Sequence, residues 1–358
     1  MAPPHIRHIR IRRLDLALRE PFSISTGARA ELRNVLVVAE LSNGIRGFGE
    51  GAPMAEFNSD SQKLTLSALE RATAAFIGRE VSDWRGLLEL VDRTLESRRG
   101  AARAALGMAL LDAWARWRDI PLRLLFGGAE STLRSDVTVT LVPAPQARLA
   151  ARRIRRMGVD TIKIKVGKDL DEDQDRVLAV AEAAPKAALI LDANQGYGPR
   201  DCLKLLRRLS RHGITPALFE QPADKDDWQG LRDVHRFGKV LVAADESVSS
   251  PEQALRMAKE RAAQVINVKL MKAGLLAAWD IALIAKGSGL GLMIGGMVES
   301  QLAMGCAAHL AAGVGGFKFV DLDTPLWLKA SPMRGLRMGR GGLYDLASKR
   351  PGIGVRPD

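Results

Sequence analysis

The sequence predicts an α/β protein, a (β/α)7β barrel covered by an α+β capping domain. From residue 136 onward, short β-rich runs alternate with helical segments. The runs recur about every 25 residues, as expected for parallel strands joined by helical crossovers. Eight such runs can close a barrel. The alternative is a doubly wound open sheet, which usually carries a Gly-rich phosphate loop after its first strand, and this sequence has none there.

The expected barrel strands are short, and their apolar residues are largely β-branched or alternate with polar ones. They are 136–141, 161–166, 188–191, 217–220, 240–244, 264–269, 290–294 and 318–321. Apolar residues at helical spacing fill the intervals between strands, most clearly at 171–184, 200–212 and 250–260. This alternation places the barrel in the second part of the chain.

Ahead of the barrel, the sequence predicts an antiparallel sheet. Residues 14–18 alternate apolar and polar side chains, residues 34–41 are β-rich, and residues 42–44 form a turn signal before a third strand. Between the first two strands, the polar segment 21–30 is rich in Ser and Gly and predicts a mobile loop. The sheet is therefore expected to carry one long loop of its own.

Helices are expected to follow this sheet. Helical spacing begins near residue 61 and is clearest at 101–117, where small residues predict close packing. Pro121 and the pair Gly127-Gly128 then interrupt the pattern. We place a domain boundary there, with a capping domain at 1–127 and the barrel at 128–325.

The net charge of +12 does not by itself indicate a nucleic-acid-binding protein. Arginines gather at 7–13 and 152–156, but the first group alternates with apolar residues and the second lies on the polar face of a helix. No aromatic side chains stand among them to stack on bases. A positive field that attracts an anionic substrate is the better interpretation.

Membrane and secretion signals are not expected from this composition. No apolar run approaches the ~20 residues that span a bilayer, and no apolar segment follows the basic N-terminus as in a signal peptide. Cys202 and Cys306 are the only cysteines and lie far apart in the chain. We therefore expect free thiols and a cytoplasmic protein.

Two lysines share one face of the strand at 161–166. With a period of two, Lys163 and Lys165 point to one side and the isoleucines between them to the other. Alone, such a pair is most often a solvated strand face. The strands that follow change this interpretation, because they also end in charged residues.

Asp192, Glu220 and Asp245 end the third, fourth and fifth expected strands, and Lys269 ends the sixth. Active-site groups of a β/α barrel lie at these C-terminal strand ends. A single acid there can be a helix cap, but three on adjacent strands repel one another unless a cation lies between them. Oxygen ligands of this kind suit Mg²⁺ first and Mn²⁺ second. The alternative is a ring of salt bridges between the same acids and lysines, whose burial is costly.

These residues resemble the enolase superfamily, and within it the muconate lactonizing subgroup. The Lys163-Ile164-Lys165 run resembles its paired-lysine motif, the three acids resemble its metal ligands, and Lys269 resembles its second lysine base. The resemblance covers nearly the whole chain and implies a C-terminal segment, 326–358, that returns to the cap. The mandelate racemase subgroup would instead carry a histidine near the end of the seventh strand, and none is there.

The resemblance also implies a reaction. Enolase-superfamily sites are a general example of a Lys or His base that works with Mg²⁺ to stabilise an enediolate. Lys165 would be the base, and the positive charges of Lys163 and the metal would lower its pKa. Lys269, across the barrel mouth, would serve the opposite face of the same carbon. Two bases on opposite faces imply a racemase or epimerase.

The acids after the eighth strand indicate the substrate class. Asp321 and Asp323 can be simple turn formers, but their Asp-x-Asp pattern resembles the signature of dipeptide epimerases. In that group the pair binds the free ammonium of the dipeptide. Thr138, Thr26 and Met297 are further candidate substrate-binding residues.

Side-chain specificity is expected to differ from that of the alanyl-glutamate epimerases. Thr26 stands where a member of that group has an arginine, and Arg29 follows three residues later. We expect no strong preference for glutamate, with Phe22 and Phe57 as candidate walls for a larger or apolar side chain. Lys272 is expected to be an exposed lysine at a helix start.

The predicted function is therefore a Mg²⁺-dependent dipeptide epimerase, an isomerase that acts as a homo-oligomer on a small molecule, without nucleic-acid or membrane partners. Other members of the subgroup are alternatives, namely an N-acylamino-acid racemase, an o-succinylbenzoate synthase or a muconate cycloisomerase. Their substrates have no ammonium to pair with the Asp-x-Asp acids. A non-catalytic, basic binding protein is the alternative from another class.

Overall fold

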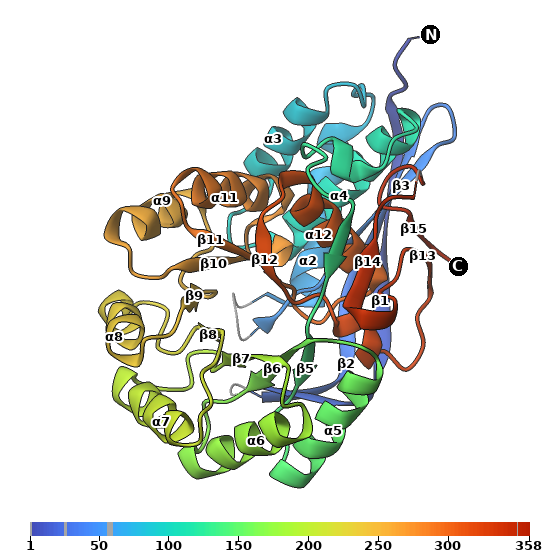
Figure 1. Cartoon of the computed structure of the whole chain (residues 1–358). Coiled ribbons are helices and arrows are strands. Elements are labelled where there is room, and N and C mark those ends of the chain that lie inside the picture. The colour runs from blue at the N-terminus through green and yellow to red at the C-terminus, as the bar shows by residue number, and fades with distance from the viewer. Residues whose placement is uncertain (1, 25–26, 56–59, 349) are drawn as a thin grey trace.

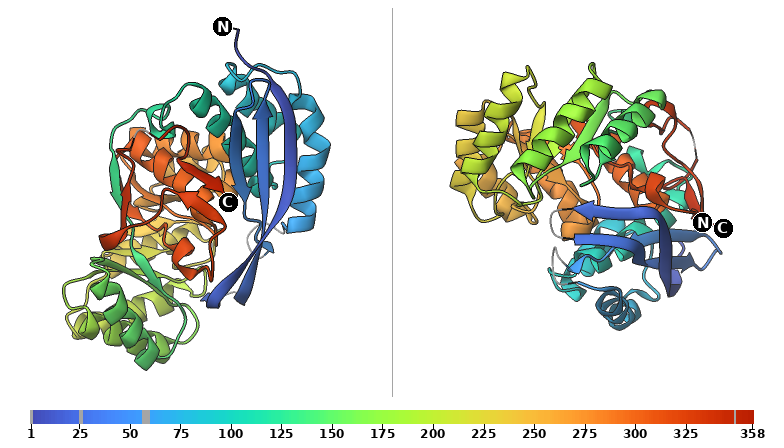
Figure 2. Two further views of the ribbon diagram at one scale, coloured as in Figure 1. Left: turned by 90° about the vertical axis from the view of Figure 1, so that its right-hand side faces the viewer. Right: turned by 90° about the horizontal axis from the view of Figure 1, so that it is seen from below.

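The computed structural model describes residues 2–24, 27–55, 60–348 and 350–358, and only the backbone of residues 21–24 and 27–29. The chain forms two parts (Figure 1). One is a curled ring of strands with helices outside it, and the other is a sheet with helices beside it. The second part stands against one side of the ring (Figure 2).

Three antiparallel strands form the sheet of the capping part, in the order β1-β2-β3. They are β1 (Ile6–Ile24), β2 (Gly27–Leu41) and β3 (Arg46–Gly51). The helices beside the sheet are α2 (Gln62–Ala72), η1 (Thr73–Phe76), α3 (Trp84–Thr94) and α4 (Gly100–Trp117). The predicted order of sheet and then helices is confirmed.

The small residues of α4 allow the close packing that the sequence predicted. A Cβ atom at Gly47 would lie 2.1 Å from the carbonyl oxygen of Ala109, and one at Gly49 would lie 2.0 Å from that of Ala105. No side chain fits at such distances, so only glycine lets β3 lie directly on α4. Each of these glycines on β3 thus lies against an alanine of α4.

The predicted long loop at 21–30 is wrong. β1 continues to Ile24 and β2 begins at Gly27, so the two strands pair with each other through most of this segment. The Ser- and Gly-rich composition indicates a loop only from local preference. Strand formation also depends on the partner across the ladder, which local composition does not contain.

Eight parallel strands form the barrel. They are β5 (Val137–Val139), β6 (Thr161–Lys165), β7 (Ala188–Asp192), β8 (Leu218–Glu220), β9 (Val242–Ala244), β10 (Val265–Val268), β11 (Gly291–Ile294) and β12 (Phe317–Val320). The helices are α5 (Ala144–Arg156), α6 (Leu170–Ala183), α7 (Pro199–Arg211), α8 (Trp228–Gly238), α9 (Pro251–Glu260), α10 (Leu270–Ala273), α11 (Leu275–Gly287) and α12 (Gln301–Val314). All eight predicted strands are confirmed, and their bounds differ by two residues at most.

The strands follow one another around the sheet without a change of order, from β5 to β12. Its two edges are joined by a hydrogen bond of 2.8 Å from the Asp136 amide to the Val320 carbonyl. The Leu322 amide adds a 2.8 Å bond to Ser135 Oγ. The sheet therefore curls back on itself, and the predicted (β/α)7β barrel with its capping part is confirmed.

The C-terminal segment runs back between the barrel and the cap (Figure 2). Its elements are η3 (Thr324–Trp327), β13 (Met333–Gly335), η4 (Arg340–Gly342), β14 (Leu343–Asp345) and β15 (Val355–Pro357), and β14 pairs with the short strand β4 (Thr132–Arg134). Arg116 on α4 donates to the Val355 carbonyl at 2.7 Å. The Ile353 amide donates to Asp112 Oδ1 at 2.7 Å. The segment thus holds the cap helix by its own backbone.

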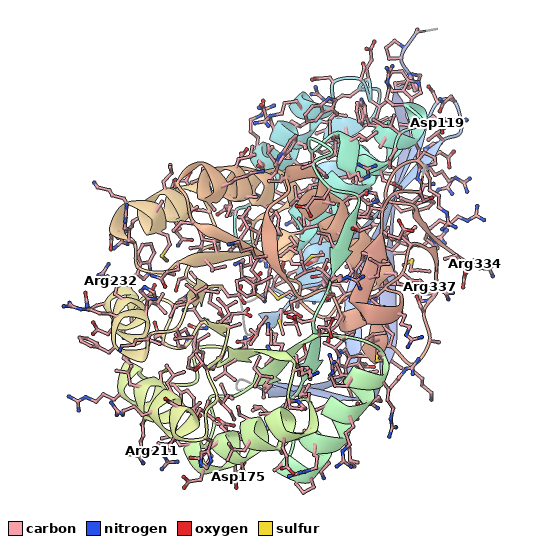
Figure 3. All side chains as sticks on the ribbon, in the orientation of Figure 1. Asp119, Asp175, Arg211, Arg232, Arg334 and Arg337 are labelled. Carbon is pink, nitrogen blue, oxygen red and sulfur yellow. The ribbon has the colours of Figure 1, made fainter. Side chains whose placement is uncertain are left out.

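Three labelled charged side chains of the outer helices, Asp175, Arg211 and Arg232, point away from the ring (Figure 3). Across the described residues, no helix is both long enough and apolar enough to cross a bilayer. Cys202 and Cys306 are free thiols, as predicted, and both are buried.

Candidate active site

The barrel interior is built in two layers, one apolar and one polar. Ile190, Leu218, Ala243, Val265 and Met293 form a separate buried cluster inside the ring. Successive side chains of a strand point to opposite faces, so the residue two positions further on points inward again. The inward residues above this cluster are Asp192, Glu220, Asp245 and Asn267. The strand period therefore places the predicted acids on top of an apolar floor.

Lys163 and Lys165 reach this polar layer from β6, and both are buried. Lys163 Nζ lies 2.8 Å from Asp192 Oδ2, 2.7 Å from Glu220 Oε2 and 2.6 Å from Asp321 Oδ2. Lys165 Nζ donates to Asp192 Oδ2 at 2.6 Å. The interpretation of this pair as a solvated strand face is therefore wrong.

Lys269 enters the same layer from the other side of the ring. It directly follows β10, the sixth barrel strand, whereas Lys165 ends the second, so half of the barrel separates them. Its Nζ lies 2.6 Å from Asp245 Oδ2. The structure thus brings together all three predicted lysines and all three predicted acids.

The prediction that Lys272 is exposed is wrong. The side chain is buried, and its amine bonds Asp245, the residue that follows β9. Its Nζ donates to the Asp245 carbonyl at 2.6 Å, to Asp245 Oδ1 at 3.0 Å and to the Asn267 carbonyl at 2.7 Å. These bonds use all three ammonium protons, so Lys272 holds Asp245 in place and has no proton left for a substrate.

Opposing charges divide the acids into two kinds. Burial raises the pKa of Asp192, but the ammonium groups of Lys163 and Lys165 outweigh it and bring the pKa below its ordinary value. Burial also acts on Asp245, and there Lys269 and Lys272 lower the pKa in the same way. In Glu220, burial and then the neighbouring Asp192 raise the pKa to about 7. The site thus holds two firmly ionised acids and one that titrates near neutrality.

The predicted ammonium-binding acids lie beside this layer. Asp321 Oδ2 contacts Lys163, and Asp323 Oδ2 accepts a 2.7 Å bond from the Thr138 amide. Burial and the nearby Asp321 raise the pKa of Asp323 to about 6. Asp323 Oδ1 is buried and accepts no hydrogen bond. One oxygen of the pair is therefore left without a donor.

The other predicted substrate contacts have mixed outcomes. Thr138 is buried next to Asp323, and its backbone amide is what contacts that acid. Met297 is also buried, in the loop after β11, where its amide donates to Glu299 Oε1 at 2.6 Å. Four predicted residues lie wholly or partly outside what the structure describes, namely Thr26, Phe57 and the side chains of Phe22 and Arg29.

Two family models match the chain. One, described as "Mandelate racemase / muconate lactonizing enzyme, N-terminal domain", matches residues 6–127, and "Enolase C-terminal domain-like" matches residues 146–358. The chain belongs to the mandelate racemase/muconate lactonizing enzyme family. The resemblance to the enolase superfamily predicted from the lysines and acids is thereby confirmed.

Individual members of this family are similar along the whole chain. An "Aromatic dipeptide epimerase" of Herpetosiphon aurantiacus is 42% identical and covers 96% of this chain and 97% of its own length. A "Hydrophobic dipeptide epimerase" of Citrifermentans bemidjiense is 38% identical, covering 95% and 94%. The dipeptide epimerase of Enterococcus faecalis, solved with Mg and the dipeptide L-Leu-L-Tyr, superposes with a TM-score of 0.93 at 31% identity, covering 98% and 99%.

The donor set fits the magnesium ion that this family relative binds. Glu220 Oε2 and Asp245 Oδ2 are buried and accept no hydrogen bond of good geometry, although a lysine Nζ lies near each. Buried carboxylate oxygens that accept no hydrogen bond suit a hard divalent cation. Among the described residues, no group of three or more Asp, Glu, His or Cys side chains stands around a common metal position. A lysine Nζ lies within 2.8 Å of an oxygen of each of the three acids.

Sequence reasoning missed several polar residues of the layer. Asn267 donates to Glu220 Oε1 at 2.7 Å, and Asn194 accepts from Lys165 Nζ at 2.9 Å. Asp136 is buried with both carboxylate oxygens unbonded, and burial followed by Asp321 raises its pKa well above the ordinary value. Asn267 and Asp136 lie two positions before Lys269 and Thr138, so strand alternation alone could have found them.

Proposed function

We propose that this chain is a Mg²⁺-dependent dipeptide epimerase, an isomerase that inverts the α-carbon next to the dipeptide carboxylate. The observation that carries the proposal is the placement of Lys165 and Lys269 half a barrel apart, with three buried acids between them. Family members named as dipeptide epimerases support the same reaction.

The residues of this chain divide the proton transfer between two faces of the substrate. Neutral Lys165 takes the α-proton from one face, and the electron pair of the C–H bond moves into the substrate carboxylate group. The ammonium of Lys269 then returns a proton to the opposite face, which inverts the carbon. In the reverse direction the two lysines exchange roles.

Asp192, Glu220 and Asp245 would hold the metal ion, with Mg²⁺ favoured by oxygen-only ligands and Mn²⁺ the second candidate. When bound, the ion withdraws negative charge from the substrate carboxylate and so makes the α-proton more acidic. Lys163 remains cationic, since the surrounding carboxylates raise its pKa well above the ordinary value despite burial. It adds a fixed positive charge to the same region.

The acid pair supports a substrate with a free ammonium group. Asp321 and Asp323 lie together beside the layer, and Asp323 Oδ1 has no donor of its own. An ammonium ion supplies such a donor, and hydrogen bonds to charged groups are the strong ones. This favours a dipeptide over the N-acylated amino acids and over the substrates of o-succinylbenzoate synthase and muconate cycloisomerase.

For the side chains we propose an apolar or aromatic preference, with Thr138, Met297 and Thr26 among the contacts. The names of the similar proteins, aromatic and hydrophobic dipeptide epimerases, support that preference. The Enterococcus relative was solved with L-Leu-L-Tyr, a dipeptide with one aliphatic and one aromatic side chain.

We also propose that the chain divides into a capping domain at 1–127, the barrel at 128–325 and a C-terminal segment at 326–358. The bonds from Asp112 and Arg116 to residues 353 and 355 support the last segment as a connection to the cap. A cytoplasmic location and a homo-oligomeric state stay predictions.

A panel of dipeptides in D₂O with Mg²⁺ tests the function. Mass spectrometry should detect one α-deuterium in each accepted dipeptide, and chiral chromatography should detect the epimer. A Lys165→Ala/Lys269→Ala double variant is the control and should give neither. If the purified protein bound dipeptides but exchanged no α-proton in any of them, the binding-protein alternative would replace the epimerase.

A further inference from the structure

Next to Lys165, helix α6 carries a buried ion pair that the proposed chemistry does not use. Asp173 and Arg176 are 0% and 3% exposed, although both belong to a helix whose other charges face water. Asp175, between them, points outward at the rim of the molecule (Figure 3). A buried pair of this kind contributes little to stability unless its groups have further hydrogen-bond partners.

Arg176 makes those bonds to the end of β6 and to the loop after β5. Its Nε donates to the Val142 carbonyl at 2.6 Å, and its Nη1 donates to the carbonyl of Lys165 at 3.3 Å. Nη1 also bonds Asp173 Oδ1. The guanidinium therefore holds the backbone of the candidate base itself, together with the loop that follows β5.

Asp173 fixes the residues just after the base. Its Oδ2 accepts from the Gly167 amide at 2.7 Å and from the Lys168 amide at 3.1 Å. The same oxygen accepts a hydrogen bond from the hydroxyl of Tyr197. One carboxylate thus joins the loop after β6 to the loop after β7.

The amine of Lys165 is held by the last residue of β7 and by the start of the loop that contains Tyr197. Asp192 Oδ2 and Asn194 Oδ1 accept from Lys165 Nζ at 2.6 and 2.9 Å. Two glycines bring this loop against the loop after β6. A Cβ at Gly196 would lie 2.2 Å from the Gly167 carbonyl, and Gly167 itself has a φ of +107°. Main chain therefore packs on main chain, without a side chain between.

We propose that Asp173, Arg176 and Tyr197 act as a positioning clamp for Lys165. The clamp holds the backbone of the base through Arg176 and the loop that orients its amine through Tyr197. None of its bonds reaches Lys269, whose contacts come from Asp245 on the other side of the ring. This inference rests on the proposed function, and it predicts that loss of the clamp weakens proton transfer on one face only.

The test measures α-proton exchange in D₂O separately for the two epimers of one dipeptide. Lys165→Ala first identifies the epimer whose exchange depends on Lys165. Tyr197→Phe then removes one hydrogen bond of the clamp and little volume. Its exchange with that epimer should fall about tenfold, since small misplacements of a reacting group cost up to about a hundredfold, while exchange with the other epimer should stay within about twofold.

A matched control lies in the cap, far from the site. Asp112 is buried, pairs with Arg116 one turn later and accepts from two backbone amides, as Asp173 does. Arg116→Lys should change the exchange of both epimers equally or not at all, and Arg176→Lys should repeat the one-sided loss. Hydrogen–deuterium exchange of the backbone provides a readout that needs no activity. Tyr197→Phe should speed exchange at the amides of Gly167 and Lys168, and Arg116→Lys should not.

Each result decides one question. Equal loss with both epimers, unchanged activity, or unchanged amide exchange at residues 167–168 would refute the clamp. If the wild-type protein exchanged no dipeptide, the proposed epimerase would fall. The amide exchange would then still decide whether these three residues hold Lys165 in place.

Discussion

His309 provides a prediction that connects pH to the joint between barrel and tail. It lies in α12 and is buried. Its Nδ1 accepts a 3.0 Å hydrogen bond from the Arg123 amide, and its Nε2 lies 3.1 Å from the Ile353 carbonyl. An amide can only donate and a carbonyl can only accept, so the ring is neutral with its proton on Nε2. A second proton would point Nδ1–H at an N–H group.

The magnitude follows from the pKa. Burial lowers the pKa of His309 from 6.5 to about 4. Because the folded pKa is depressed, the unfolded chain binds more protons between these two values, and stability is lost as the pH falls through this window. One pKa unit corresponds to about 1.4 kcal/mol, so roughly 3 kcal/mol of the free energy of unfolding depends on this ring. The contribution is fully present above pH 6.5 and is gone below about pH 4.

Urea unfolding at pH 7 and pH 4.5 measures this effect by comparing variants. His309→Gln keeps one acceptor and one donor but cannot be protonated in this range. Between pH 7 and pH 4.5, the wild type should therefore lose roughly 2 to 3 kcal/mol more of its free energy of unfolding than His309→Gln loses. His212→Gln, at the exposed end of α7, is the control. If wild type and His309→Gln lost the same stability, the neutral, doubly bonded ring would be refuted.

Three further predictions concern the chemistry. Glu220→Gln should abolish turnover and weaken Mg²⁺ binding in calorimetry while circular dichroism stays unchanged; full activity in that variant, or after exhaustive chelation, would contradict the metal site. Lys165→Ala and Lys269→Ala should each stop epimerisation, yet each should keep α-proton exchange with a different epimer; if both kept the same one, the two-face scheme would be wrong. N-acetylation of a good dipeptide should lower kcat/KM by about tenfold to a hundredfold, as loss of a charged hydrogen bond costs about 1.5–3 kcal/mol. Asp323→Asn should reduce the difference in kcat/KM between the free and the acetylated dipeptide. Equal turnover of the two substrates by the wild type would contradict the assignment of Asp321 and Asp323 as the ammonium-binding pair.

Most of the barrel could be predicted because short β-rich runs alternate regularly with helical segments in the sequence. A strand buried in a parallel barrel needs only its own apolar pattern and a helix of suitable length after it, and both are local features. The acids at 192, 220 and 245 could then be placed together because parallel strands end at the same rim. The structure places the predicted lysines and acids in contact at this rim.

Both failures share a cause, since each segment depends on a partner outside its own local sequence pattern. The strands at 21–24 and 27–30 form because they pair with each other, although the composition favours a loop. Lys272 was predicted to be an exposed lysine at a helix start, but its amine donates a hydrogen bond to the carbonyl of Asp245, 27 positions earlier. Local propensity does not include either partner.

The residues around Lys165 include some that a local sequence pattern predicts and some that only the packed structure shows. Asn267 and Asp136 escaped prediction although the strand period contains them. The hydrogen bond from Arg176 to the Lys165 carbonyl could not be predicted in this way. It forms only because α6 packs against the barrel with Arg176 level with the end of β6. A helix rises 1.5 Å per residue, and the side chain that meets a given strand end changes with the length of the loop before the helix. Alternation along β6 predicts where Lys165 points, and only the packed α6 shows what holds it there.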